Sequence, residues 1–167
     1  MSSDNHSNKA STNMVPEAAN IGLMRPPFIY LGAITLGVLL HFTWSVRFVP
    51  PAVSVPLGCI TVLIAIALFL WAVREFRIAN TPVPGNRPTT AIVRTGLYRC
   101  SRNPIYLSFS LLQLGIAYWV NSLWLLITLI PAVALMSFVV IPREEQYLET
   151  LFPLDYLSYK ASVRRWL

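Results

Sequence analysis

The sequence predicts an all-α integral membrane bundle of four transmembrane helices, with a cytoplasmic loop and an amphipathic C-terminal segment forming a pocket at one end. Hydrophobic residues make up 55% of the 167-residue chain, and charged residues only 12%. The mean hydropathy is +0.57. A soluble domain carries about 25% charged residues, so this chain lacks the polar surface that water requires. Long uncharged runs separated by arginines then locate the helices.

The uncharged runs place the spans in chain order. Residues 1–24 are rich in Ser, Asn and Ala without an apolar core, which predicts a disordered tail rather than a signal peptide. About 20 apolar residues cross a bilayer, and Asn121-Ser122 interrupts the uncharged run 103–142 as the tip of a hairpin would. We therefore expect one domain over residues 25–167, with spans at about 27–46, 55–74, 104–120 and 123–142.

The distribution of charge predicts the topology. A polar loop over residues 75–103 is rich in Pro, and six Arg with one Glu lie between Arg74 and Arg102. By the positive-inside rule this loop is cytoplasmic, and so are both termini. The C-terminal segment 143–167 spaces its large apolar residues as an amphipathic helix does. The net charge of +6 comes mostly from arginines that flank apolar runs, which indicates contact with membrane lipids and not with nucleic acid.

Two polar clusters are expected to meet at the cytoplasmic ends of the last two spans. The first reads T-G-L-Y-R-C-S-R-N-P-I-Y over residues 95–106, and the second is Arg143-Glu144-Glu145. Arg102 offers a planar set of donors for a carboxylate, and a helix beginning at Pro104 favours an anion. Topology alone explains the arginines but not the adjacent acids, which need partners. We interpret the clusters as two sides of one site for a zwitterionic ligand.

The remaining polar residues within the spans give weaker signals. His41 permits two interpretations, a functional group inside the membrane or a neutral ring near the end of the first span. Cys59 and Cys100 have no spacing that predicts a disulfide. Without a cluster of His, Cys and Asp, we expect no metal site.

The first cluster resembles the Gly-x-Tyr-Arg-x-x-Arg-His/Asn-Pro-x-Tyr signature of the isoprenylcysteine carboxyl methyltransferase family, which also includes phospholipid methyltransferase-like membrane enzymes. The matching residues are Gly96, Tyr98, Arg99, Arg102, Asn103, Pro104 and Tyr106. A second family block is matched by Arg143, Glu144, Glu145, Leu148, Phe152, Tyr156, Tyr159 and residues 163–165. The resemblance covers about residues 55–167. It departs at Asn103, where His is frequent, and at Pro153, where Gly is usual.

The resemblance implies S-adenosylmethionine as the methyl donor. The residues implied to bind it are Tyr98, Arg102, Asn103, Pro104, Tyr106, Glu144 and Glu145. Arg143, which would orient the acceptor, and Glu145 are the catalytic candidates. The expected reaction is carboxyl O-methylation of a lipophilic or isoprenylated-cysteine-type acceptor. The expected location is a bacterial inner membrane, because the chain is small and no targeting segment is evident.

Three alternatives remain open at this point. N-methylation of a phospholipid or a small amine would use the same donor. An NADPH-dependent sterol-type reductase has a similar Arg-x-Pro-x-Tyr end, although Leu107-Ser108 does not supply the Gly-Glu that usually follows the tyrosine. A small membrane scaffold would bind neither cofactor.

Overall fold

The computed structural model describes residues 25–83 and 89–167, and all regular structure in these residues is helical, without a strand. The predicted all-α class is therefore confirmed. The tail over residues 1–24 and the middle of the polar loop lie outside the described residues.

Most of the helices begin at a proline. The bounds are α1 Pro26–Thr43, α2 Pro51–Ile78, α3 Pro104–Val120, α4 Leu123–Leu135, α5 Ile141–Leu151 and α6 Pro153–Ser162. A π-helical turn, Met136–Val140, joins α4 to α5, and a 3₁₀ turn, Gly96–Arg99, lies in the loop before α3. Proline suits the first helical position because the N–H that it lacks would have no partner within the helix there.

Three helices of the described chain are long and apolar enough to cross a membrane. They are Pro26–Thr43, Pro51–Ile78 and the continuous helix Leu123–Leu151. The fourth expected span, α3, is apolar but has only 17 residues, so its crossing stays a prediction.

Two helices extend beyond the spans expected from hydropathy. The α2 helix begins at Pro51, not near residue 55, and runs through Pro56, because a proline near the start of a membrane helix is readily accommodated. The fourth span does not end at Pro142. It continues as α5 because the preceding turn widens into a π-helix, in which the Ile141 N–H bonds the Met136 carbonyl. A π turn suits this place, since Pro142 has no N–H for the usual bond.

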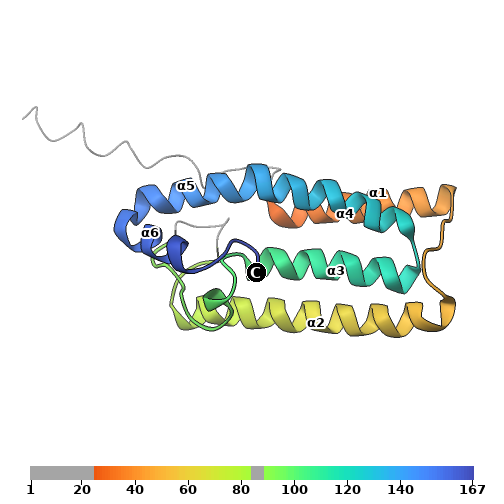
Figure 1. Ribbon diagram of the computed structural model, residues 1–167, viewed down its shortest axis with the longest axis horizontal. Helices are drawn as coiled ribbons and strands as arrows, with labels where there is room; N and C mark the ends of the chain where they lie inside the picture. Colours follow the sequence, from red (N-terminus) through yellow and green to blue (C-terminus); the bar gives the residue numbers. More distant parts are fainter. Residues whose placement is uncertain (1–24, 84–88) are drawn as a thin grey trace, which may run out of the picture.

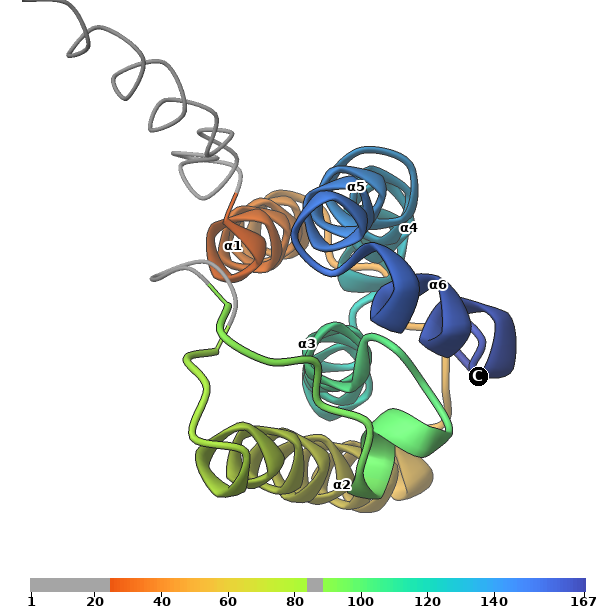
Figure 2. The same cartoon turned by 90° about the vertical axis from the view of Figure 1, so that its left-hand side faces the viewer.

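The helix α3 lies between α2 on one side and the pair α1 and α4 on the other (Figures 1 and 2). Glycines allow these close approaches, as is common between membrane helices. A Cβ on Gly58 of α2 would lie 2.5 Å from the backbone nitrogen of Trp119 in α3. On α1, a Cβ on Gly37 would lie 2.8 Å from side-chain atoms of Leu125 and Thr128 in α4.

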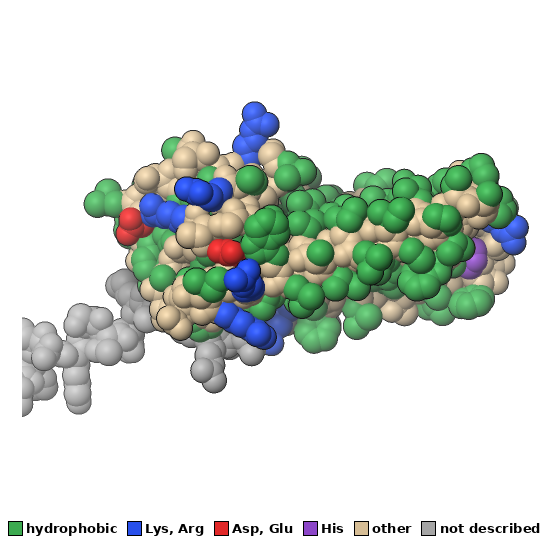
Figure 3. All heavy atoms as spheres, turned by 90° about the horizontal axis from the view of Figure 1, so that it is seen from below, with side chains coloured by type: hydrophobic (Ala, Val, Ile, Leu, Met, Phe, Trp, Pro, Cys, Tyr) green, Lys and Arg blue, Asp and Glu red, His purple; other side chains and the backbone are tan. Residues whose placement is uncertain are grey.

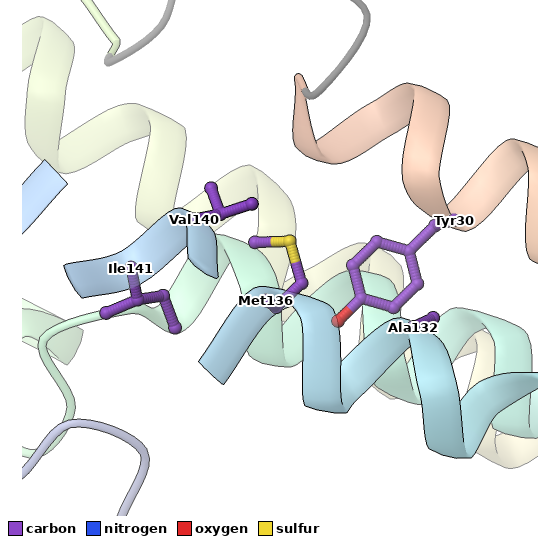
Figure 4. Packing of buried hydrophobic residues seen from close by; sticks show 5 residues of the cluster. All are labelled: Tyr30, Ala132, Met136, Val140 and Ile141. Carbon is purple, nitrogen blue, oxygen red and sulfur yellow. The ribbon is translucent and has the colours of Figure 1, made fainter. Parts of the chain in front are cut away.

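A small apolar core joins α1 to the π turn. Tyr30, Ala132, Met136, Val140 and Ile141 are buried there and pack as one cluster (Figure 4). The Tyr30 hydroxyl also shares a hydrogen bond of 2.7 Å with Ser110 of α3. This cluster fixes the direction in which the continuous helix leaves the bundle toward α5.

Asn121 joins the two connections at the end of the bundle away from the loop. Its backbone is left-handed, with φ of 52°, and it ends α3 where the hairpin turn was predicted. Its Oδ1 accepts the N–H groups of Phe48 and Val49 at 3.1 Å each, and its Nδ2 donates to the Val49 carbonyl at 2.8 Å. The α1–α2 connection is thereby fastened to the α3–α4 turn.

The surface divides into an apolar belt and a charged end. Hydrophobic side chains cover the helices in Figure 3, whereas most Lys, Arg, Asp and Glu side chains gather at one end. Leu31, Leu63 and Ile130 are 58%, 65% and 69% exposed. A soluble monomer rarely exposes so large an apolar surface, and lipid is the solvent that matches it. The C-terminus and the described parts of the loop lie at the charged end (Figure 1).

Candidate active site

A cavity of about 230 Å³ opens at the charged end. The start of α1, the second half of α2, the loop, the start of α3, α5 and α6 all contribute to its wall. Aliphatic and aromatic side chains form most of the lining. Its charged and phenolic members are Arg102, Glu144, Glu145, Tyr98, Tyr106, Tyr156 and Tyr159. Residues from both polar clusters therefore line this cavity, although Arg143 of the second cluster does not.

Glu75 anchors the loop that forms one side of this cavity. Its buried carboxylate accepts hydrogen bonds from the Thr95 hydroxyl at 2.6 Å and the Trp71 indole at 3.1 Å. Gly96 follows with φ of 55°, and a Cβ there would lie 2.5 Å from Cδ and Oε1 of Glu75. Only glycine suits both the backbone and the space. From the sequence, Glu75 was counted only among the charges near the polar loop, and this contact was not predicted.

Glu145 is the centre of an ion-pair network. Its buried carboxylate receives Nε and Nη2 of Arg165 at 3.0 and 2.8 Å. Nη2 of Arg102 lies 3.2 Å from the same carboxylate, and Nζ of Lys160 lies 3.7 Å away. This network supplies the partners that an acid beside a second acid requires. Lys160 also pairs with Glu149 at 2.6 Å.

Arg102 keeps two unused donors. Its side chain is only 9% exposed, and its Nε and Nη1 are buried without a hydrogen-bond partner among the described residues. The Tyr156 hydroxyl interacts with this guanidinium, but it does not meet these two nitrogens in hydrogen-bond geometry. Buried donors left unpaired cost stability, so an acceptor that reaches them in the cavity, from a ligand or from water, would stabilise the site.

Glu144 lies on the other wall of the cavity. The Tyr106 hydroxyl donates a hydrogen bond of 2.7 Å to its Oε2. This bond joins α3 to α5 across 38 residues of sequence. Glu144 thus faces a phenol, whereas its neighbour Glu145 faces guanidinium groups.

The tyrosines of the loop and α6 are neutral walls of the cavity. Burial raises the pKa of Tyr156 to about 12, and burial also raises the pKa of Tyr98 and of Tyr159. Tyr159 donates to the Tyr98 carbonyl at 2.7 Å, and the Tyr98 ring meets Phe76 edge-on at 5.2 Å. Such phenols are poor general bases near neutral pH, because they hold their protons.

The other predicted site residues lie at the margin of the cavity or outside it. Asn103 lines the cavity, and its amide nitrogen donates to the Arg165 carbonyl at 3.0 Å. Pro104 is buried as the first residue of α3, but it is absent from the lining. Arg143 is exposed on α5 and is also absent from the lining. Within the described residues, no group of three His, Cys, Asp or Glu side chains is arranged to hold a metal ion.

The comparison with protein families decides the class. A model described as phospholipid methyltransferase matches residues 53–155, which include both polar clusters. This chain belongs to the phospholipid methyltransferase family. The family also includes isoprenylcysteine carboxyl methyltransferase-like proteins, so the resemblance seen in the sequence is confirmed.

The comparison with individual proteins adds a relative without a described activity. An uncharacterized protein of Haemophilus influenzae is 36% identical over 63 residues, which make up 38% of this chain and 100% of that protein. No solved structure matches. Family membership and the long apolar helices together make the chain a membrane methyltransferase, and they do not favour the reductase or the scaffold.

Proposed function

We propose that this protein binds S-adenosylmethionine in the cavity and methylates the polar end of a lipophilic acceptor. The observation that carries the proposal is the pair of unused donors on Arg102, buried in a cavity that Glu144 and Glu145 also line. A cavity of mixed charge within aromatic walls suits a zwitterion that carries an adenine.

The residues present fit the methyl donor. Nε or Nη1 of Arg102 would donate to its carboxylate, since these two nitrogens lie on different edges of the guanidinium, and Glu144 would face its ammonium group. The aromatic lining, which includes Phe76 and Tyr98, would take the adenine. When bound, S-adenosylmethionine supplies an electrophilic methyl group on a positively charged sulfur.

The protein would contribute to the reaction by orienting the methyl donor and by limiting water in the cavity. Apolar and aromatic side chains exclude water from the cavity, which strengthens the electrostatic interactions inside it. Arg102 and Glu144 would hold the amino-acid end of the methyl donor and so orient its methyl group, and such orientation lowers a barrier by several kcal/mol. A carboxylate acceptor then needs no proton removed. Transfer joins opposite charges into neutral products, a change that a dry site favours.

Carboxyl O-methylation of a lipophilic acceptor remains the first candidate, with Arg143 proposed to orient the acceptor from α5. N-methylation of a phospholipid or a small amine is the second candidate, and one observation favours it. Glu144 pairs with a phenol and not with any of the cations around Glu145. In this alternative Glu144 would face the acceptor amine in place of the donor's ammonium group, and it is the acid best placed to accept a proton.

We further propose that both termini are cytoplasmic and that the membrane is a bacterial inner membrane. The Arg-rich loop and the C-terminal segment support this orientation through the positive-inside rule. On this proposal, the cavity opens toward the cytoplasmic pool of the methyl donor, while the acceptor arrives from the bilayer.

Transfer of a radiolabelled methyl group to membrane lipid extracts would test the function. Labelled lipid should form with the wild type, and mild base should release labelled methanol if the product is an ester. Label that resists base would instead identify N-methylation. In that case Glu144→Gln should lower kcat more than it raises KM. An absence of labelled product with any lipid fraction, from folded protein that binds no S-adenosylhomocysteine, would refute the proposal.

A further inference from the structure

The last residues of the chain return to the start of α3. The backbone N–H of Arg102 donates to the Arg164 carbonyl at 3.0 Å, and Asn103 holds the Arg165 carbonyl. On the other side, the Trp166 indole donates to the Ser137 hydroxyl at 3.2 Å. The C-terminal segment therefore connects the end of the loop before α3 to the π turn.

The side chain of Arg165 uses all three of its nitrogens. Nε and Nη2 grip the two oxygens of Glu145 at 3.0 and 2.8 Å, and Nη1 donates to the Ser137 carbonyl at 3.3 Å. These contacts form a planar, two-point pairing with the carboxylate, which is the strongest arrangement open to arginine. The hydrogen bond to Glu145 accordingly raises the pKa of Arg165.

The pairing of Arg165 with Glu145 affects which donors of Arg102 are left for a ligand. Both arginines face the same carboxylate, but Arg102 reaches it through Nη2 alone, at 3.2 Å. Its Nε and Nη1 stay buried and unpaired. Without Arg165, only Lys160, 3.7 Å away, would compete with Arg102 for Glu145, and Glu145 would turn to pair with Arg102 at two points, because such pairing satisfies a buried donor. One of the two unpaired donors of Arg102 would then be occupied, and the guanidinium would be turned toward Glu145.

We propose that Arg165 is a positioning residue that occupies Glu145 and thereby keeps two donors of Arg102 open for the carboxylate of the methyl donor. This inference rests on the proposed function, because it assigns that carboxylate to Arg102. Arg165 itself does not line the cavity.

A different role for Arg165 makes a different prediction. If Arg165 merely fastens the C-terminal segment, its loss should weaken every ligand of the cavity alike. If it keeps Arg102 open, its loss should weaken only ligands that carry the carboxylate. Two probes separate these roles: S-adenosylhomocysteine, and its decarboxylated analogue, in which a hydrogen replaces the carboxylate.

Calorimetry in detergent would measure both affinities for the full chain. We expect Arg165→Ala to lower the affinity for S-adenosylhomocysteine about tenfold, as when charge-assisted hydrogen bonds go unmade. Its affinity for the decarboxylated analogue should fall by less than about twofold. Lys160→Met is the matched control, because it removes a nearby cation that lacks the two-point grip. It should change the ratio of the two affinities by less than about twofold.

Each other result is decisive. An equal loss for both probes, or no loss for either, would overturn the role of Arg165 while leaving the proposed function in place. If the folded wild type binds neither probe, the proposed function is overturned and this inference with it. Should Arg165→Ala fail to fold, the same ratio in Arg165→Lys decides, because lysine keeps the charge but lacks the planar fork.

Discussion

Gly96 offers a sharp test of how the cavity wall is built. Its φ of 55° is a left-handed backbone, and a Cβ there would lie 2.5 Å from Cδ and Oε1 of Glu75. Gly96→Ala therefore strains the 3₁₀ turn and also pushes against a buried carboxylate. That carboxylate cannot withdraw freely, because Thr95 and Trp71 hold it.

Two contributions set the expected loss of stability. The left-handed conformation costs a residue with a Cβ about 1–2 kcal/mol. Displacing Glu75 weakens its hydrogen bond with Thr95, and a hydrogen bond to a charged group contributes about 1.5–3 kcal/mol. Gly96→Ala should thus lower the free energy of unfolding by about 2.5–5 kcal/mol. It should also weaken ligand binding, since Tyr98 lies in the displaced turn.

Thermal unfolding in detergent would measure the loss, with Gly32→Ala as the matched control. A Cβ on Gly32 meets nothing within 4 Å, and alanine favours the helix by about 0.5–1 kcal/mol over glycine. Its melting temperature should therefore hold or rise. The double variant Gly96→Ala, Glu75→Ala should be less destabilised than the sum of its single variants, because the clash is gone. A Gly96→Ala protein as stable as the wild type would refute this account of the loop.

Further predictions concern the rest of the fold. Asn121→Ala should destabilise the protein by about 2–4 kcal/mol in detergent unfolding, because it breaks three hydrogen bonds and strains a left-handed residue. A variant as stable as the wild type would contradict the role of Asn121 in joining the two connections. Gly58→Ala should cost about 1–3 kcal/mol by the same assay, since α2 must move away from Trp119, and an unchanged melting temperature would contradict this packing. Burial raises the pKa of Tyr156 to about 12 in the folded protein, against about 10 when unfolded. The contribution of its protonated hydroxyl to the free energy of unfolding is therefore complete below pH 10 and declines as pH rises toward 12. Tyr156→Phe should reduce the fall in melting temperature between pH 9 and pH 11.5, and an equal fall in both proteins would contradict that shift.

Uncharged runs and turn residues were enough to predict much of the fold. They placed α3 and its hairpin turn to the residue, because Pro104 and Asn121 are strong local signals. They misplaced the end of the fourth span. The sequence reads Pro142 as a stop, whereas the π turn before it lets the helix continue to Leu151. Such a turn has no signature in local hydropathy.

Part of the cavity lining was predictable from the sequence, but the pairing within it was not. Charge and motif brought Arg102 and Glu145 to one cavity, as the structure has them. The grip of Arg165 and the anchoring role of Glu75 depend on contacts 20 residues apart in sequence. The turns that bring these residues together leave no periodic pattern. The loop glycine was noted as part of a signature, and only its φ and the nearby carboxylate explain why it must be glycine.

The central claim is that Arg102 anchors the methyl donor in this cavity. Calorimetric binding of S-adenosylhomocysteine to purified wild type, Arg102→Met and Arg99→Ala tests it most directly. Arg102→Met leaves Glu145 paired with Arg165 and Lys160, so no buried acid is stranded, and Arg99 is an exposed arginine of the same signature. We expect the wild type and Arg99→Ala to bind alike, and Arg102→Met to bind at least about tenfold more weakly. Equal binding by Arg102→Met, or none by the wild type, would contradict it.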